Sequence, residues 1–211
     1  FAGEYDYVLE LLRNCYFPTR EGVANFHDIY VDALLLAGYA QLEKGQASEA
    51  VSLFREAFTY PANHQVFLVD ERTPRDAEIY VAEARALEVM GEKAAALESW
   101  KAAAAVDTQT SDARYWKAVA QKHLGDKKAA RALFRELVKD GKARMVQDIV
   151  NFYGAEGTTG VTVESINAAA LYTRALGEEG LGHHLKSRRL MSEVRRLDPA
   201  HLGAAQYRKL L

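Results

Sequence analysis

The chain has 211 residues and a formal net charge of −2, so no broad basic surface predicts nucleic-acid binding and no acidic tail predicts a solvating role. Its single cysteine, Cys15, leaves no partner for an internal disulfide or a cysteine-based zinc site, and no apolar run approaches the roughly 20 residues that span a bilayer. Because the sequence begins at Phe1 rather than Met, we expect a processed or partial chain, from the cytoplasm or from the periplasm or a secreted protein.

An amphipathic helix is predicted over residues 4–16, with Tyr7, Leu11 and Leu12 on its apolar face. It has the character of the second helix of a pair whose first helix lies upstream. Cys15 on this helix is expected to be a small buried apolar residue rather than a reactive thiol.

Residues 22–44 predict a long helix, and residues 48–59 predict its partner. The twelve residues that follow, 62–73, are interpreted as an insertion. Within it, the β-branched and aromatic run 65–69 favours an extended segment laid against neighbouring helices. Asp76 is then expected to cap the next helix.

Helical periodicity continues through most of the remaining chain. Helices are predicted over residues 76–90, 93–106, 111–124 and 127–139. A second insertion, 145–167, is expected to hold one more helix over 145–153 and a glycine-rich loop over 154–162. The last predicted elements are a helix pair, 164–178 and 183–196, and a terminal helix over 198–211.

Four glycines sit in one recurring pattern: Gly45, Gly91, Gly125 and Gly182. Seven residues before each glycine, and five after it, stands a small residue: Gly38, Ala84, Ala118 and Ala175, then Ala50, Ala96, Ala130 and Ser187. Nine residues after it stands a bulky one: Phe54, Trp100, Phe134 or Met191. Small residues let two helices approach closely, the glycine reverses the chain, and the bulky residue fills the space between the helices. Each pattern therefore predicts an antiparallel helix pair that must stack on a neighbour to bury its apolar face.

This pattern resembles the tetratricopeptide repeat, a two-helix unit of about 34 residues. The run LLLAGYAQLEKGQASEAVSLFREAFTYP, residues 34–61, carries small, bulky and proline residues where the family expects them, and Gly91 and Gly125 are 34 residues apart. The resemblance implies an all-α fold, a right-handed superhelical solenoid that spans residues 1–211 as a single array. Its units are expected at about 31–64, 77–110, 111–144 and 168–201, with insertions at 65–76 and 145–167.

The resemblance also implies a protein-interaction scaffold whose concave groove is lined by the first helix of each unit. Ligand-facing positions in the family lie ten, six and three residues before the turn glycine. On this chain these positions are Leu35, Tyr39, Leu42, Val81, Arg85, Glu88, Tyr115, Val119, Lys122, Tyr172, Leu176 and Glu179. Of these, the predicted groove residues are Leu35, Tyr39, Arg85, Glu88, Tyr115, Lys122 and Tyr172. Tyrosine and arginine suit protein recognition because they offer contact area with little side-chain entropy to lose. The partner is a protein or peptide, or the groove is filled by the chain's own insertions or by a neighbouring domain of the same polypeptide.

No catalytic residue, metal site or cofactor is predicted. The glycine-rich loop lacks the Lys-Ser/Thr ending of a phosphate-binding loop and follows no predicted strand. His183 and His184 are adjacent, so they point to different sides of a helix and make a poor metal chelate. Both are expected to be exposed residues of a turn.

The tail offers a second, looser similarity. The run from Arg114 to Ala118 and the ending LeuAspProAlaHisLeuGlyAla are similar to the C-terminal repeat region of large bacterial proteins, in which a tetratricopeptide array follows a β-rich, carbohydrate-enzyme-like region of unknown function. This similarity implies the alternative that the chain is a non-catalytic helical appendage that packs on a catalytic domain.

Overall fold

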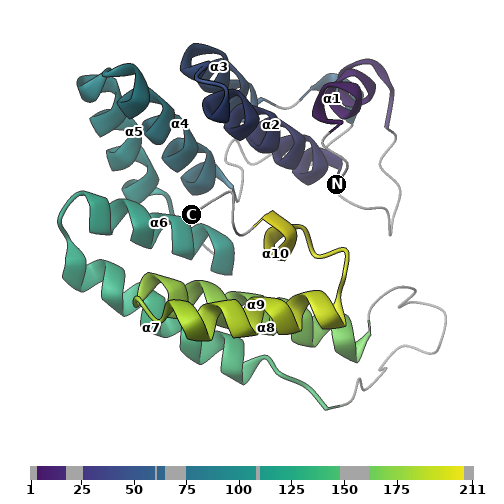
Figure 1. The fold of residues 1–211 in the computed structure, drawn as a ribbon, viewed down its shortest axis with the longest axis vertical. Helices are drawn as coiled ribbons and strands as arrows, with labels where there is room; N and C mark the ends of the chain where they lie inside the picture. Colours follow the sequence, from purple (N-terminus) through teal and green to yellow (C-terminus); the bar gives the residue numbers. More distant parts are fainter. Residues whose placement is uncertain are drawn as a thin grey trace. The chain divides into compact units, whose positions relative to one another are not determined.

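The computed structural model describes residues 4–17, 26–59, 61–64, 75–107, 110–147 and 162–206, and the regular elements in these ranges are all helices. The all-α class predicted from the sequence is therefore confirmed. The chain divides into two compact units, residues 1–108 and 109–211, and each is described by itself (Figure 1).

Unit 1 stacks its helices in chain order. It contains α1 (Tyr5–Asn14), α2 (Phe26–Glu43), α3 (Ala47–Glu56), the short 3₁₀ helix η1 (Ala62–His64), α4 (Asp76–Met90) and α5 (Lys93–Ala105). Each α-helix packs on the one that follows it, and α2 also contacts α4 (Figure 1). This is the stacking of helix pairs that the repeated pattern predicts.

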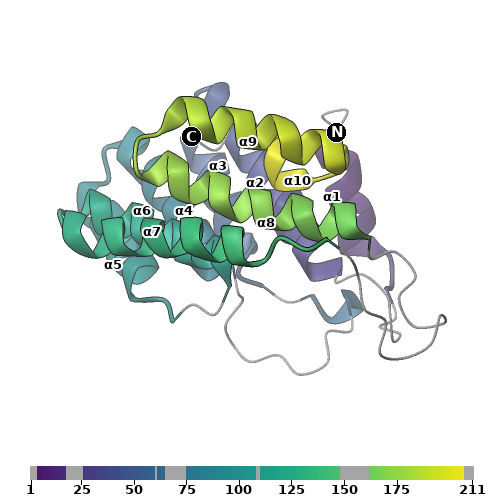
Figure 2. The same ribbon diagram turned by 90° about the horizontal axis from the view of Figure 1, so that it is seen from below.

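Unit 2 repeats the arrangement. It contains α6 (Ser111–His123), α7 (Lys127–Ala143), α8 (Val163–Gly180), α9 (His184–Leu197) and the short α10 (Leu202–Gln206). Figure 2 shows α7, α8 and α9 side by side, and α6 contacts both α7 and α8. The helix α8 therefore lies between the preceding pair and its own partner α9.

The four pattern glycines do reverse the chain. Their φ angles are 79°, 81°, 94° and 84°, in the left-handed region that favours glycine. At the end of α4, the Gly91 N–H donates to the Glu88 carbonyl (3.0 Å) and the Glu92 N–H donates to the Leu87 carbonyl (2.9 Å). These bonds satisfy carbonyls of the last helical turn and fix the start of α5.

The small residues of the pattern mark close helix contacts, as predicted. A Cβ atom added to Gly38 would lie 2.3 Å from the ring of Phe54, so α2 and α3 can approach this closely only with glycine at that position. In the last pair, the Ser187 hydroxyl donates to the Ala175 carbonyl at 2.9 Å. The small residue five after the turn glycine thus touches the small residue seven before it.

Two further glycines join α7 to α8, and the repeated pattern does not reveal them. A Cβ atom on Gly141 would lie 2.5 Å from the Ala170 carbonyl oxygen, and one on Gly177 would lie 2.6 Å from the Phe134 carbonyl oxygen. The backbones of the two helices are therefore in direct contact. α7 extends to Ala143, four residues beyond its predicted end, because its last turn packs on α8.

The predicted apolar face of α1 is right for Leu12 and wrong for Tyr7 and Leu11. Tyr7 is 61% exposed and Leu11 39% exposed, whereas Leu9 and Leu12 are buried. The position of α2 and η1 against α1 decides which face is covered, and helical periodicity alone does not contain that information. The prediction of a buried Cys15 is also wrong: α1 ends at Asn14, two residues before its predicted end, and Cys15 is exposed.

Three predicted helix boundaries also need correction. Asp76 does not cap α4, because the capping position is Arg75 and Asp76 is the first helical residue. Val146 is not helical, because its backbone N–H and carbonyl both pair with the side-chain amide of Asn167 on α8, at 2.9 and 3.0 Å. The last helix starts at Leu202 rather than at Asp198, whose carboxylate accepts a hydrogen bond from the Ala200 N–H (3.0 Å) and so holds a turn there.

Several predictions concern residues outside the described ranges. These are the extended run 65–69, most of the helix predicted over 145–153, the loop 154–161 and the end of the terminal helix beyond residue 206.

Candidate functional site

The predicted groove residues lie on the first helices of four pairs. Within unit 1, α2 and α4 contact each other, and within unit 2, α6 and α8 do so. Each unit therefore sets two first helices side by side, which brings the ligand-facing positions of successive pairs onto neighbouring helices.

Three of the groove residues are buried: Leu35 is 2% exposed, Tyr39 7% and Tyr115 3%. The ring of Tyr39 lies 5.3 Å from that of Phe54, and the ring of Tyr115 lies 5.8 Å from that of Phe134. Burial raises the pKa of Tyr39 to about 12, and the neighbouring Arg85 partly opposes the rise. These two tyrosines pack on the bulky residue of their own helix pair, and their contact with a partner stays a prediction.

The other groove residues are accessible to different degrees. Glu88 and Lys122 are exposed, and Arg85 and Tyr172 are half-buried. Glu88 accepts a hydrogen bond from the indole Nε1 of Trp100 at 3.0 Å, which holds its carboxylate against α5. The accessible charges of the predicted groove are therefore Arg85 and Glu88 in unit 1 and Lys122 in unit 2.

The half-buried Tyr172 is covered in part by the C-terminal segment of unit 2. Its ring centroid lies 4.6 Å from that of His201. A Cβ atom on Gly203 would lie 2.3 Å from the Tyr172 hydroxyl oxygen, so α10 rests directly on this ring. Burial also lowers the pKa of His201.

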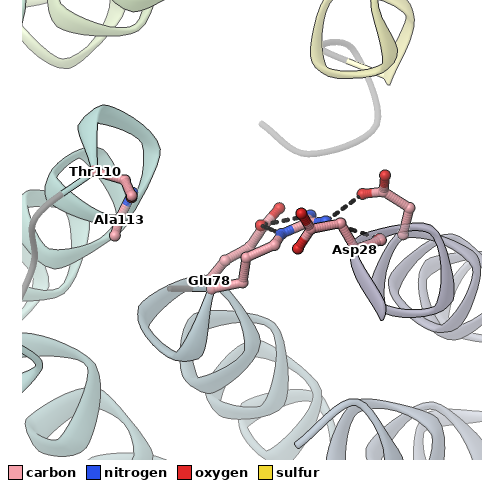
Figure 3. A network of polar contacts seen from close by, with 6 residues as sticks. Asp28, Glu78, Thr110 and Ala113 are labelled. Atoms are coloured by element: carbon pink, nitrogen blue, oxygen red, sulfur yellow. Dashed lines mark hydrogen bonds and ion pairs between the residues drawn. The ribbon is translucent and has the colours of Figure 1, made fainter. Parts of the chain in front are cut away.

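A half-buried arginine that the sequence pattern does not reveal links α2 to α4. Arg75 donates to the carboxylates of Asp32 (2.6 Å) and Glu78 (2.7 Å) and to the backbone carbonyl of Asp28 (3.3 Å). Figure 3 shows Glu78 and Asp28 on facing helices with these contacts between them. Burial alone would lower the pKa of Arg75, but the two carboxylates outweigh it and raise the pKa. Sequence spacing gives no signal for this contact, because Asp32 and Arg75 are 43 residues apart.

A second network ties α1 to the first helix pair. Arg13 donates from Nε and Nη2 to the two oxygens of Glu56, at 2.7 and 2.6 Å, and the Tyr30 hydroxyl donates to the same carboxylate at 2.5 Å. Burial would raise the pKa of Glu56, but the bonds from Arg13 and Tyr30 outweigh it and lower the pKa. Burial raises the pKa of Tyr30 to about 12. Both networks pair their carboxylates with an arginine, an arrangement that joins helices rather than preparing a proton donor.

The two turn histidines are exposed, as predicted, and each bonds a carboxylate at the end of α8. His183 Nδ1 lies 2.7 Å from Glu178 and His184 Nδ1 lies 2.6 Å from Glu179. Across the described ranges, no group of three histidine, cysteine, aspartate or glutamate side chains is arranged to hold a metal ion.

None of the described helices combines the length and the apolar character needed to cross a membrane.

We compared the chain with known protein families, curated proteins and solved structures. The family model of the tetratricopeptide repeat matches residues 32–59 and 112–140. A comparison with curated proteins finds no match. Among solved structures, the chain is similar to "MamA RS-1 ArsTM double mutant", with 19% identity over 85% of each chain and a TM-score of 0.31, a value too low to support a statement about this chain. The two matched segments coincide with the pairs α2–α3 and α6–α7, so each unit contains one helix pair similar to the tetratricopeptide repeat, within a chain whose described elements are all helical.

Proposed function

We propose that the chain is a non-catalytic protein-interaction scaffold that binds a peptide or a protein surface in a concave groove formed by its first helices. The groove residues are the seven predicted from the repeat: Leu35, Tyr39, Arg85, Glu88, Tyr115, Lys122 and Tyr172. The solenoid is proposed to run through units at about 31–64, 77–110, 111–144 and 168–201. No cofactor is part of this proposal.

The charged pair Arg85 and Glu88 on α4 supports this proposal. On α4, Arg85 and Glu88 lie three residues apart, at the ligand-facing positions six and three residues before Gly91, and Glu88 is exposed. Residues three apart share one side of a helix, so an arginine and a carboxylate face the same way. Such a pair can exchange charge-assisted hydrogen bonds with a partner's backbone or side chains. Tyr39 of the neighbouring α2 is buried and lies close to Arg85.

The test is affinity capture from a lysate of the source organism with the chain as bait. The variant R85Q/E88Q removes both charges without changing the net charge, and glutamine at position 88 still offers an oxygen to Trp100. We expect this variant to capture about tenfold less of the main partner protein than the unmodified chain does, or less still. A tenfold decrease corresponds to the loss of roughly 1.4 kcal/mol of binding free energy. The double variant E98Q/K101Q is the matched control, because these residues form an exposed pair on the second helix α5.

Equal capture by the two variants would reject the groove on α4, provided that circular dichroism shows both variants folded. If the captured protein is instead a neighbouring domain of the same polypeptide, the appendage alternative gains support. A β-rich region with paired acids encoded upstream of Phe1 would support it too.

A further inference from the structure

Unit 2 contains a surface hollow of about 230 Å³ between the start of α7 and the turn that joins α8 to α9. Its floor is formed by Ala130 and Phe134 of α7 and by Leu181 of the turn. Its rim carries three cations: Lys122, Lys127 and Arg131. We call these six residues the cationic hollow.

The rim cations are not neutralised within the described part of the chain. There, none of the three forms an ion pair or a side-chain hydrogen bond, whereas Arg114 of the same unit pairs with Asp140 at 2.6 Å. Among the residues that the structure describes, no carboxylate lines the hollow. The acid Glu178, close by in the chain, is held by Lys186 at 2.5 Å. The hollow therefore keeps three positive charges that a ligand can meet.

The helix pair does not need cations at these positions to fold. Lys122, Lys127 and Arg131 stand three residues before, two after and six after the turn glycine. The equivalent residues are Leu42, Ala47 and Val51 in the first pair, Glu88, Lys93 and Leu97 in the second, and Glu179, His184 and Arg188 in the last. The third pair is the one of these four with a permanent cation at all three positions.

The helix dipole favours Lys122, in the last turn of α6, and disfavours Lys127. Lys127 is the first residue of α7, and positive side chains are unfavourable beside the positive end of a helix dipole. In the second pair, the residue equivalent to Lys122 is Glu88, which accepts a hydrogen bond from Trp100. Lys122 and Phe134 cannot form that bond. The positive charge of Lys127 therefore does not stabilise the helix that carries it.

The edge of the hollow also lets a ligand reach the backbone. Gly182 belongs to the lining, and a Cβ atom placed on it would meet nothing within 4 Å. On the other side, a Cβ on Gly180 would lie 2.2 Å from the ring of Phe134, so the end of α8 rests on that ring. The hollow is thus fixed in shape on the α8 side and open at the turn.

We propose that the cationic hollow binds a short acidic segment of a partner protein. Carboxylates of the segment pair with Lys122, Lys127 and Arg131, and one apolar side chain lies over Leu181. Charge complementarity selects this occupant, because three cations around a mainly apolar floor match carboxylates that flank an apolar residue. The inference rests on the proposed function as a protein-binding scaffold, and it assigns a partner chemistry to the groove residue Lys122 on α6 together with Lys127 and Arg131 on α7.

The test measures binding of a fluorescein-labelled peptide, Gly-Glu-Asp-Leu-Asp-Glu-Gly, to the full chain by fluorescence anisotropy. K127Q/R131Q should weaken binding at least about tenfold, the effect expected for the loss of two charged contacts. The matched control is R135Q/K139Q, which removes two exposed cations from the same helix outside the hollow. Replacing the central leucine of the peptide by serine should also weaken binding. Added salt should weaken the binding of both peptides, because it screens their charge contacts with the chain.

Three results would overturn the proposal: no binding to the unmodified chain, an equal loss in K127Q/R131Q and R135Q/K139Q, or displacement of the peptide by inorganic phosphate at the peptide's own concentration. The last result would assign the hollow to a free anion. The groove variant R85Q/E88Q should bind the peptide normally. Loss of lysate capture by R85Q/E88Q, together with absent peptide binding, would reject the hollow and leave the proposed function standing.

Discussion

His27 is a buried histidine near the start of α2, with 2% of its surface exposed. Burial lowers its pKa to about 4, and the positive charges of His64 and Arg75 add to the effect. Tyr30 lies beside it, with 6.4 Å between ring centroids. Because the unfolded chain holds this proton up to a pKa near 6.5, it binds more protons than the folded chain between about pH 4 and pH 6.5. Stability should therefore fall as the pH falls through that window.

The first prediction is a loss of roughly 2 kcal/mol in the free energy of unfolding of unit 1 between about pH 7 and pH 5 from His27 alone. The loss is measured by urea denaturation of the W116F variant, with the fluorescence of Trp100 as the signal for unfolding of unit 1. H27Q cannot take up the proton, so its stability should depend less on pH by this amount. H123Q, at an exposed histidine, should keep the full dependence, and an unchanged slope in H27Q would contradict the assignment.

The second prediction concerns the contact of Gly38 with Phe54. A Cβ atom at position 38 would lie 2.3 Å from a rigid aromatic ring, so G38A must displace Phe54 or separate α2 from α3. We expect a loss of about 1–3 kcal/mol in the free energy of unfolding, although alanine is the better helix former. The double variant G38A/F54L should recover part of the loss, since leucine leaves room for the methyl group. A stable G38A would show that the helices separate at little cost.

At the scale of the helices, the contact between α2 and α4 depends on Arg75. Removing the guanidinium in R75M leaves Asp32 and Glu78 as neighbouring carboxylates with little solvent access. The third prediction is a loss of about 3 kcal/mol or more in the free energy of unfolding near pH 7, measured by urea denaturation. The triple variant D32N/R75M/E78Q removes both negative charges and should recover most of that loss. Equal stability of the two variants would mean that the carboxylates are not the source of the cost.

The helix pairs were predictable because their signal is local. A turn glycine, two small residues and a bulky residue lie within about one repeat, and each acts through contacts inside its own pair, as Gly38 and Phe54 show. The buried face of α1 was not predictable, since α2 and η1 decide whether Leu9 or Tyr7 is covered. The last turn of α7 depends likewise on α8, through the contact of Gly141 with the Ala170 carbonyl.

The candidate site was predictable only in part, for the same reason. The positions of Arg85 and Glu88 follow from their distance to the turn glycine, and both carry accessible charge. The burial of Tyr39 and Tyr115 depends on the ring that stands nine residues after each turn. Spacing in the sequence cannot show whether a tyrosine faces that ring or a partner.

The hollow itself has no signature in the sequence. Its cations come from α6 and α7, whereas Leu181 follows α8, more than forty residues after Arg131 in the chain. Their meeting depends on how α8 packs on α7, which involves glycines inside both helices. Arg75 and Asp32 are a similar case, with 43 residues between the partners.

At the scale of the whole chain, two compact units each contain a family-matched helix pair and one tryptophan. Trp100 is buried in unit 1 and Trp116 in unit 2. In a repeat protein, stability is approximately the sum of the stabilities of the repeats and of their nearest-neighbour contacts. A local defect should therefore act mainly on the unit that contains it.

The fourth prediction follows from that sum. The W116F background keeps only Trp100, whose fluorescence reports the unfolding of unit 1. The W100F background keeps only Trp116, whose fluorescence reports the unfolding of unit 2. G38A is introduced into each background. The urea midpoint should fall clearly for Trp100, since Gly38 and Phe54 lie in unit 1, and should change by less than about half as much for Trp116. Comparing G38A with its own background removes the effect of the tryptophan substitution itself. Equal shifts in both reporters would mean that the units unfold as one cooperative body, so that a defect in α2 is felt as strongly in α6 as beside Phe54.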